Sequence, residues 1–358
     1  AIMITLGQKI DIQPVKHSRL PATDLNQVKF GRVFSDHMFV MDYVDGQWRE
    51  PRIVEYSDLR MSPAALVLHY AQTIFEGLKA YRSMDGSVKL FRPEMNIKRM
   101  NLSAHRMCMP ALPEDLFLDA LKTLIRMDKG WIPSDDEGAL YIRPFMYASD
   151  EYIGVKPSDN YRFIIFTCPV RNYYKDTVRV KVETKYSRAF PGGTGEAKCG
   201  GNYAASLYPA QLAQREGFEQ LLWTDGEEHA YFEESGTMNV FFRIDDTMLT
   251  PATTGSILHG VTRDSIIRIA QHEKVPIEVR RITVKEVVDA LKQGRLKAAF
   301  GAGTAATIAH IRSIAYEGIT YDLPPVEERN LSNHLGQVLD DIRRGRIADP
   351  FGWMVPVE

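Results

Sequence analysis

The sequence is poor in cysteine and has no long hydrophobic run. Three of its 358 residues are cysteines, Cys108, Cys168 and Cys199, and they lie far apart. Isolated thiols are typical of a reducing compartment and argue against a disulfide framework or a zinc site. No apolar stretch approaches the roughly 20 residues that a membrane-spanning helix requires, and the first residues are too polar for a signal peptide. We therefore expect a cytoplasmic protein with no membrane partner.

An excess of charge of either sign is also missing. Lysine and arginine number 44 and aspartate and glutamate number 46, so the formal net charge is −2. A nearly neutral chain gives no reason to expect nucleic acid as a partner. With 44% hydrophobic and 25% charged residues, the composition is that of a globular protein with a large core. The length suggests two domains.

Hydrophobic patterns predict a mixture of helices and strands. In the first half, strands are expected over 37–43, 139–149 and 161–170, and helices from Pro93 and over 114–133. In the second half, helices are expected over 202–217, 261–272, 284–294 and 326–345, and strands over 219–225, 229–235, 238–244, 277–282 and 296–303. This irregular order predicts an α+β fold and argues against a doubly wound dinucleotide fold.

The composition of the sequence changes near residue 170. The stretch that follows is polar and charged and ends in Pro191-Gly192-Gly193. We expect a first domain over 1–170, an interdomain linker over 171–182 and a second domain over 183–358.

The segment FPGGTGEAKCGGNYAAS, residues 190–206, surrounds Lys198 with five glycines. Glycine loses much conformational entropy on folding, so such a cluster requires a reason. The segment is not a nucleotide-binding P-loop, because Ala197 stands where that motif needs glycine and Cys199 where it needs serine or threonine. Taken alone, the segment leaves two interpretations open: a surface lysine in a flexible turn, or a lysine that forms a Schiff base.

Two adjacent carboxylates, Glu233 and Glu234, occur in the segment EESGTMNVFF. Successive side chains of a strand point to opposite faces, so one carboxylate can face solvent while the other points into a site. A carboxylate beside a pyridine nitrogen keeps that nitrogen protonated and makes the ring an electron sink. Two ordinary surface charges are the alternative.

Three further segments could bind an anion. Gly260, Val261 and Thr262 stand at an expected helix start, where free N–H groups favour negative charge. The small residues of FGAGTAAT could offer successive N–H groups. Arg99 lies on the helix expected from Pro93, and its planar guanidinium suits phosphate. Each segment alone is also compatible with an ordinary helix end, turn or surface arginine.

The order of the motifs is more specific than any one of them. The segments FEGLKAYR, LFRPEMNIKRM, YIRP, GEAKCGGNYAAS, FEESGTMNVFF, LHGVTR and FGAGTAA follow one another along the chain. Together they resemble the branched-chain amino-acid aminotransferases, in the longer branch that includes the animal enzymes. The resemblance implies the fold-type IV architecture of pyridoxal 5'-phosphate enzymes, with a smaller α/β N-terminal domain and a larger, barrel-like C-terminal domain.

The resemblance implies roles in cofactor binding. Lys198 corresponds to the lysine that binds pyridoxal 5'-phosphate covalently and transfers the proton. Tyr203 corresponds to the tyrosine at the cofactor's phenolic oxygen, and Glu234 to the carboxylate at the pyridine nitrogen, which leaves Glu233 as the outward-facing neighbour. Leu258 would pack on the ring. The phosphate would be bound by Arg99, Val261, Thr262 and Thr304.

It also implies a substrate pocket and a partner. An apolar pocket for the branched side chain would be lined by Phe30, Phe75, Tyr141, Tyr203 and Thr237. The α-carboxylate would be held by Tyr70, Arg143, Thr304 and Ala305. Ile153 and Val155 correspond to a loop that closes the pocket of a neighbouring subunit, so we expect a homodimer. The expected reaction is transamination of L-leucine, L-isoleucine and L-valine with 2-oxoglutarate.

Other functions are compatible with parts of this pattern. Within the same fold, a D-amino-acid aminotransferase or an aminodeoxychorismate lyase is the main alternative. A protein that binds the cofactor without turnover is a second, and a nucleotide-binding enzyme that uses the glycine-rich loop is a third. The motifs GTGEAKCGGNY and YIRP favour the branched-chain group.

Overall fold

The computed structural model describes residues 9–171 and 176–358, which form two compact units. Unit 1 comprises 9–171, 197–200 and 342–358, and unit 2 comprises 176–196 and 201–341. Both units combine sheet and helix, which confirms the expected α+β class. None of the described helices is both long and apolar enough to cross a membrane.

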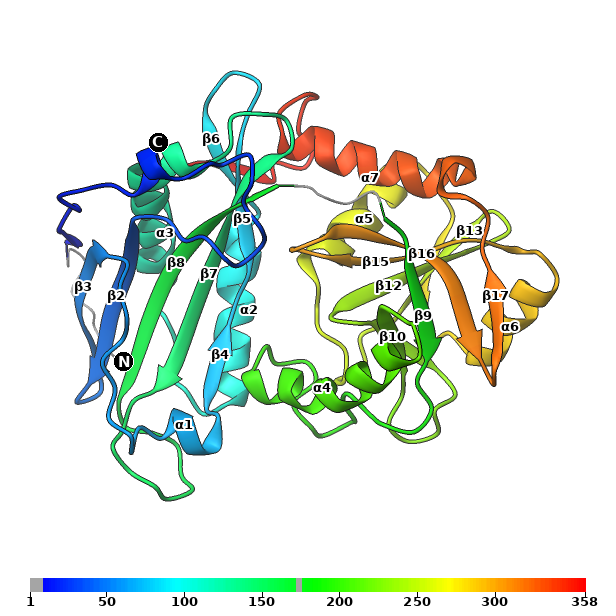
Figure 1. Cartoon of the computed structure of the whole chain (residues 1–358), viewed down its shortest axis with the longest axis horizontal. Coiled ribbons are helices and arrows are strands. Elements are labelled where there is room, and N and C mark those ends of the chain that lie inside the picture. The colour runs from blue at the N-terminus through cyan, green and yellow to red at the C-terminus, as the bar shows by residue number, and fades with distance from the viewer. Residues whose placement is uncertain (1–8, 172–175) are drawn as a thin grey trace. The chain divides into compact units, whose positions relative to one another are not determined.

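Unit 1 is built on one nine-stranded sheet (Figure 1). Its strands are β1 (Asp11–Ile12), β2 (His37–Val44), β3 (Gln47–Glu55), β4 (Thr73–Phe75), β5 (Leu78–Arg82), β6 (Val88–Phe91), β7 (Gly138–Ala148), β8 (Tyr161–Arg171) and β18 (Met354–Pro356). The order is β1-β3-β2-β8-β7-β5-β6-β18, with β4 paired to β7. The two long strands β7 and β8 are paired along their whole length and form the centre of the sheet.

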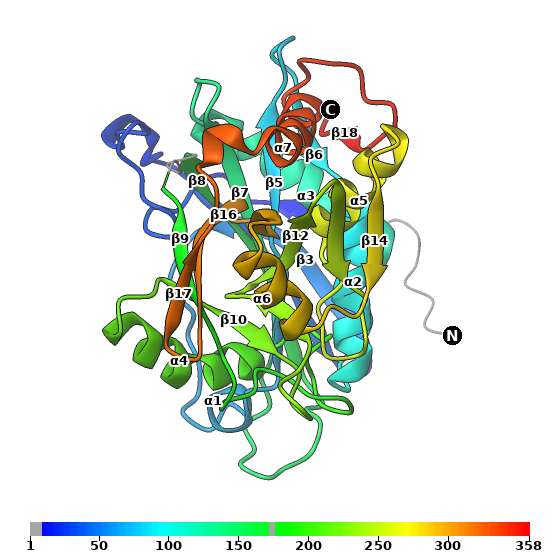
Figure 2. The same ribbon diagram turned by 90° about the vertical axis from the view of Figure 1, so that its right-hand side faces the viewer.

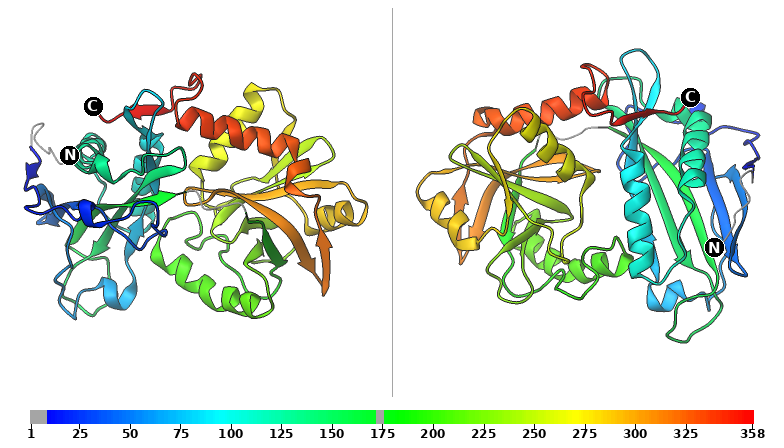
Figure 3. Two further views of the ribbon diagram at one scale, coloured as in Figure 1. Left: turned by 45° about the horizontal axis from the view of Figure 1, so that its top comes forward. Right: turned by 180° about the vertical axis from the view of Figure 1, so that it is seen from behind.

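Two helices pack on this sheet, as the right-hand view of Figure 3 shows. They are α2 (Pro93–Arg106) and α3 (Glu114–Asp128), while α1 (Val67–Tyr70) is a single turn. Proline at the first position of α2 has the fixed φ that a helix start favours. The buried side of α3 is formed by Phe117, Leu121 and Leu124, which share a core with the strands. Apolar residues at this helical spacing produce the one-sided packing.

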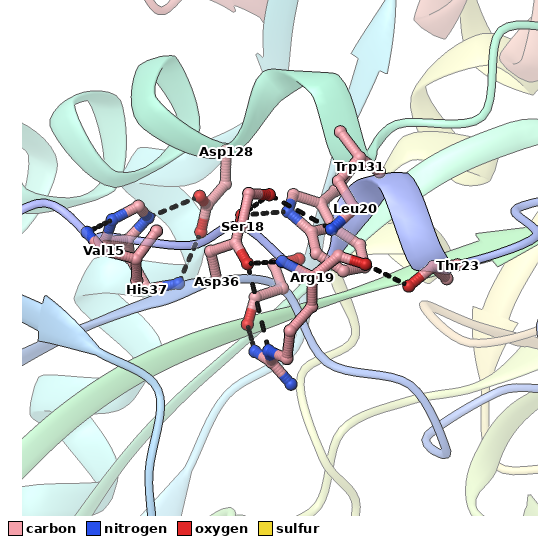
Figure 4. A network of polar contacts seen from close by, with 10 residues as sticks. Val15, Ser18, Arg19, Leu20, Thr23, Asp36, His37, Asp128 and Trp131 are labelled. Atoms are coloured by element: carbon pink, nitrogen blue, oxygen red, sulfur yellow. Dashed lines mark hydrogen bonds and ion pairs between the residues drawn. The ribbon is translucent and has the colours of Figure 1, made fainter.

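A buried histidine ties the first described residues to the start of β2. The His37 Nδ1 lies 2.7 Å from Asp128 Oδ1, and the backbone N–H of Val15 donates to His37 Nε2 at 3.0 Å. Figure 4 shows this arrangement. Burial lowers the pKa of His37, but the hydrogen bond and charge of Asp128 outweigh that effect, so the pKa is raised.

Asp36 makes a second set of contacts in the same network (Figure 4). Its carboxylate accepts hydrogen bonds from Ser18 Oγ at 2.6 Å, the Arg19 N–H at 2.9 Å and Trp131 Nε1 at 3.0 Å. Burial works against the charge, yet these donors lower the pKa of Asp36 overall. The carboxylate therefore fixes the chain near residue 18, which leads on to Phe30.

Unit 2 contains a closed barrel. Its strands are β9 (Val178–Val182), β10 (Gln220–Thr224), β11 (Phe232–Ser235), β12 (Met238–Ile244), β13 (Thr247–Pro251), β14 (Ile277–Arg280), β15 (Leu296–Gly303), β16 (Thr307–Tyr316) and β17 (Ile319–Asp322). The pairings β9–β10, β10–β11, β11–β12, β12–β15, β15–β16 and β16–β9 close a ring of six strands. This confirms the expected barrel-like character of the second half.

The helices of the second half are α4 (Gly200–Arg215), α5 (Val261–His272), α6 (Val284–Lys292) and α7 (Asn330–Arg343). Helix α6 begins with a capping box, in which the Thr283 hydroxyl accepts from the Glu286 N–H and Glu286 accepts from the Thr283 N–H. Its valines join the core formed by the barrel strands. Figure 2 shows α6 in front of the strands β16, β12 and β10.

The units differ from the expected domain ranges in three respects. Of the expected linker over 171–182, residues 172–175 lie outside the described residues, and β9 occupies its last part as a barrel strand. The C-terminal residues belong to unit 1, because β18 pairs with β6. Residues 197–200 also belong to unit 1, because Cys199 is buried in its core.

Candidate active site

Lys198 lies in a short extended segment that is anchored to β4. Its backbone carbonyl accepts a hydrogen bond from the Phe75 N–H at 3.0 Å, and its N–H donates to Ser103 Oγ at 2.9 Å. The flanking residues Ala197 and Cys199 are buried in the core of unit 1. Because side chains alternate along an extended chain, Lys198 is turned away from that core. The segment is therefore a fixed support for one ammonium group, and the alternative of a flexible surface turn is wrong for this stretch.

An aromatic ring accompanies the Lys198 ammonium group. Its Nζ lies 4.6 Å from the centroid of the Phe75 ring, within range for a cation–π contact. Phe75 is the last residue of β4 (Thr73–Phe75), so this strand positions the ring beside Lys198.

Arg99 is fixed on α2 by a buried carboxylate. Its Nε and Nη2 donate to Glu76 Oε1 and Oε2, both at 2.7 Å. Asn96, one turn earlier on the helix, donates to Glu76 Oε2 at 2.9 Å. Glu76 is completely buried. This bidentate contact fixes the plane of the Arg99 guanidinium and compensates its charge inside the protein.

Breaking this ion pair is expected to destabilise the protein. The Glu76→Ala variant leaves the guanidinium of Arg99 buried without its carboxylate, which costs about 3–5 kcal/mol. We expect this drop in the free energy of unfolding in urea titrations followed by circular dichroism. The control Glu94→Ala, at an exposed position in the first turn of the same helix, is expected to cost less than about 1 kcal/mol. Equal losses in the two variants would contradict the structural role given to Glu76.

Four of the expected substrate residues lie together in unit 1. Arg143 donates from Nη2 to the Tyr141 hydroxyl at 2.9 Å, and its guanidinium carbon lies 4.6 Å from the Phe75 ring centroid. Phe30 contacts Tyr141 edge-on, with ring centroids 5.0 Å apart. Burial raises the pKa of Tyr141, against the opposing charge of Arg143, so the phenol stays protonated and keeps its O–H as a donor. The cluster offers apolar ring surface with one fixed cation.

Gly77 allows this cluster to form. A Cβ atom at Gly77 would lie 3.0 Å from the Cζ atom of Tyr141 and would meet its hydroxyl more closely still. Any other residue at this position would push the Tyr141 ring away from Arg143. The glycine of the FEGLKAYR motif therefore serves side-chain packing in the cluster.

Tyr70, Ile153 and Val155 lie together at another place in unit 1. The Tyr70 hydroxyl donates to the Ile153 carbonyl at 2.8 Å. All three side chains are exposed, and Val155 is 85% exposed. In the single chain, the apolar side chains of Ile153 and Val155 are therefore exposed to solvent.

In unit 2, Glu234 lies in a tight hairpin. Strands β11 and β12 pair antiparallel, with Glu234 opposite Asn239, and the turn between them contains Gly236 at φ +58°. Directly opposite residues point to the same face. Accordingly, Glu234 Oε1 accepts from the Leu258 N–H at 3.1 Å and Asn239 donates to the Leu258 carbonyl at 2.9 Å. The pair therefore fixes the backbone of Leu258 from both sides.

The expectation that Glu233 faces outward is wrong. It is buried like Glu234, and its Oε1 accepts a hydrogen bond from Ser256 Oγ at 2.8 Å. The reason is that the loop containing Ser256 covers it. Burial raises the pKa of Glu233 to about 7, although Ser256 and Arg188 act in the opposite direction.

Arg188 is the cation beside the two carboxylates. Its Nε lies 3.1 Å from Glu234 Oε2, and it also donates from Nη2 to the Ser256 carbonyl. A carboxylate next to a buried guanidinium favours its charged form. Arg188 therefore places a positive charge beside Glu234.

The start of α5 has the properties of an anion site. Val261 and Thr262 are buried, and the preceding Gly260 makes no side-chain cap for the first N–H groups. Glycine is required there, because any Cβ would collide with Asn239 Oδ1. The helix dipole and the N–H groups of the first turn favour negative charge at this end.

The remaining expected residues lie in unit 2 at turns and helix starts. Thr237 is exposed in the β11–β12 turn, Thr304 and Ala305 lie in the turn between β15 and β16, and Tyr203 lies in the first turn of α4. Gly301 and Gly303 have a packing role, because a Cβ at either position would lie within 3 Å of the Met238 side chain. Among the described residues, no cluster of His, Cys, Asp and Glu side chains could hold a metal ion.

Several residues that contact Arg99, Lys198 and Glu234 were not identified from the sequence. Glu76, Ser103 and Arg188 stand far along the chain from their partners, and no local pattern connects them. Asn239 could have been found, because a two-residue turn at Gly236 places it opposite Glu234.

Solved structures of other proteins have the same fold. The branched-chain amino acid aminotransferase from Escherichia coli superposes with a TM-score of 0.71 at 25% identity, covering 89% of this chain and 99% of the other. The branched-chain amino acid aminotransferase from Thermobaculum terrenum, in its PLP-form, gives a TM-score of 0.71 at 21% identity and the coverages 89% and 98%.

Comparisons of the sequence agree with the motifs and identify the family. The model of the family "Amino-transferase class IV" matches residues 73–314. The chain is 46% identical over 344 residues to branched-chain-amino-acid aminotransferase 2 of Bacillus subtilis, with 95% of each chain covered. It is 40% identical to the branched-chain-amino-acid aminotransferase of Mycobacterium tuberculosis, covering 93% of this chain and 95% of the relative. The chain therefore belongs to the class IV amino-transferase family and, within it, to the branched-chain-amino-acid aminotransferases.

Proposed function

We propose that this chain transaminates L-leucine, L-isoleucine and L-valine with 2-oxoglutarate, giving the branched 2-oxo acids and L-glutamate. The observation that carries the choice of substrate is the cluster of Phe30, Phe75 and Tyr141 around Arg143. Its ring surfaces suit a branched aliphatic side chain, and its phenol and guanidinium suit a carboxylate. One methylene changes binding by only about 1–3 kcal/mol, so all three amino acids are expected to react.

We propose pyridoxal 5'-phosphate as the cofactor, because the donor groups fit its parts. Lys198 is a lysine on a fixed support, as covalent attachment of an aldehyde requires. Glu234 is a buried carboxylate beside Arg188 and suits a protonated ring nitrogen. The start of α5 and Arg99 suit a phosphate, with Thr304 as a further donor, while Leu258 and Tyr203 would contact the ring and its oxygen.

The cofactor, when bound, supplies an electron-accepting ring that stabilises negative charge at the α carbon of the substrate. This chain supplies the rest. The Lys198 amine would take the proton from the α carbon of the substrate. Glu234 would stabilise a positive charge on the ring nitrogen. By the resemblance, Arg143 and the N–H groups of Thr304 and Ala305 would hold the α-carboxylate in the orientation for proton transfer, whereas the Tyr70 hydroxyl, expected in the same role, donates to the Ile153 carbonyl within this chain.

We also propose that the enzyme works as a homodimer in the cytoplasm. The exposed apolar side chains of Ile153 and Val155 support a second copy as the partner, because they would then pack on its pocket. The three cysteines are free thiols, of which Cys168 and Cys199 are buried. Free thiols suit a reducing compartment.

A half-reaction assay tests the proposed function. The enzyme loaded with pyridoxal 5'-phosphate is mixed with L-leucine, and the absorbance of the cofactor is followed while 4-methyl-2-oxopentanoate is measured. Conversion by L-leucine, L-isoleucine and L-valine but not by D-alanine is expected, and 2-oxoglutarate should restore the first spectrum. Conversion by D-alanine alone would favour the D-amino-acid aminotransferase alternative.

A further inference from the structure

Unit 2 contains a buried group of charges that includes Glu233, Glu234, Asp225 and Arg188. Glu233 and Glu234 are adjacent on β11, with exposed fractions of 5% and 4%. The guanidinium of Arg188 lies 3.1 Å from Glu234 Oε2 and also acts electrostatically on Glu233. The other groups that act on Glu233 are the Ser256 hydroxyl, which donates to it, and the carboxylate of Asp225.

Arg188 forms an ion pair with Glu234 and also acts on Glu233. Asp225 adds no positive charge; three backbone N–H groups of residues 228, 230 and 231 donate to its carboxylate, and its pKa is lowered despite burial. Glu233 therefore shares the cation Arg188 with Glu234. Burial and its two acidic neighbours raise its pKa to about 7, so a nearby charge can change its protonation in the neutral range.

A protonated ring nitrogen at Glu234 changes the charge of this group. It adds a second cation to the group formed by Arg188, Glu233, Glu234 and Asp225. This cation favours the ionised form of Glu233, because an opposite charge nearby lowers the pKa of a carboxyl group. The hydrogen bond from Ser256 would also become stronger, since charge-assisted hydrogen bonds are stronger than neutral ones.

We propose that Glu233 is a positioning residue that loses its proton when a cationic cofactor ring binds at Glu234. This proposal rests on the proposed function, because it requires a ring at Glu234. The ionised Glu233 acts through the loop of residues 256–258, which contacts both carboxylates and Arg188. That loop contains Leu258 and leads into α5.

Proton release on binding tests this proposal. Pyridoxamine 5'-phosphate is the probe, because it has no aldehyde and does not bind covalently to a lysine. Calorimetric titrations in two buffers with different ionisation enthalpies give the number of protons released per chain. At pH 7 the wild type is expected to release more protons than the Glu233→Gln variant, and this difference should become smaller as the pH is raised through the pKa of Glu233.

The affinity for pyridoxamine 5'-phosphate should depend on pH differently in the wild type and in Glu233→Gln. As the pH falls from 8 to 6, the wild type is expected to lose affinity relative to Glu233→Gln, because the acid form of Glu233 must first ionise. The control Glu227→Gln, at an exposed position of unit 2, should behave like the wild type. A merely structural role of Glu233 would change the affinity equally at both pH values.

The results separate the two proposals. Binding with equal proton release in wild type and Glu233→Gln would overturn the role of Glu233 and leave the proposed function intact. If the wild type does not bind pyridoxamine 5'-phosphate, the proposed function fails and this proposal fails with it. Should Glu233→Gln not fold, the infrared difference spectrum of the wild type replaces it: loss of a protonated carboxyl band on binding at pH 7 supports the proposal, and no loss overturns it.

Discussion

Replacement of Lys198 by alanine is expected to reduce the rate of L-leucine transamination by about 10,000-fold. Lys198 would perform two tasks, the covalent attachment of the cofactor and the proton transfer at the substrate's α carbon. Its backbone contacts to Phe75 and Ser103 do not need the side chain, so the fold should survive the substitution. The measurement is the steady-state rate at saturating L-leucine and 2-oxoglutarate, together with the absorbance of the cofactor.

The matched control is Lys185→Ala, an exposed lysine that precedes the glycine-rich segment. It should leave both the rate and the spectrum unchanged. Added methylamine is expected to restore part of the lost rate in Lys198→Ala, because a free amine can replace the missing base. A Lys198→Ala variant with the wild-type rate would refute the catalytic role.

Replacement of Glu234 by glutamine is expected to lower kcat by about 100-fold or more, which is the size of effect seen when one preorganised electrostatic contact is lost. Glutamine keeps an oxygen for the Leu258 N–H but has no charge to balance a ring nitrogen. The ring would then accept electrons less well. Because the substrate cluster of unit 1 is unchanged, KM for L-leucine should change much less than kcat.

The stability of the Glu234→Gln variant is a second measurement that tests this assignment, because Arg188 is a neighbour of Glu234. Without the Glu234 charge, its buried guanidinium loses a neighbour at 3.1 Å. The variant is therefore also expected to be less stable to urea than wild type, whereas Glu227→Gln should match wild type in both measurements. An unchanged kcat in a folded Glu234→Gln enzyme would contradict the assignment of this carboxylate.

Much of the fold could be predicted from hydrophobic patterns. The strand expected over 238–244 and the helix expected over 261–272 have the observed bounds, because an uninterrupted apolar run and a helical repeat are local signals. The pairing of β18 with β6 could not be predicted, since it joins residues more than 260 positions apart in the sequence. Nothing in the three residues of β18 identifies the partner.

The candidate site was predictable where the chemistry lies in one segment. Lys198 and Glu234 stood out because each is part of a compact motif. The bidentate contact between Glu76 and Arg99, by contrast, depends on how α2 packs beside β4. Glu233 was wrongly expected to face solvent, because strand alternation does not reveal that the loop at Ser256 covers that face.

The most direct test of the central claim is chemical trapping of the cofactor on the protein. The enzyme is incubated with pyridoxal 5'-phosphate, reduced with borohydride, digested, and mapped by mass spectrometry. We expect a single phosphopyridoxyl group, on Lys198 in the peptide that contains GEAKCGGNY. Labelling of a different lysine, or of none, would contradict it.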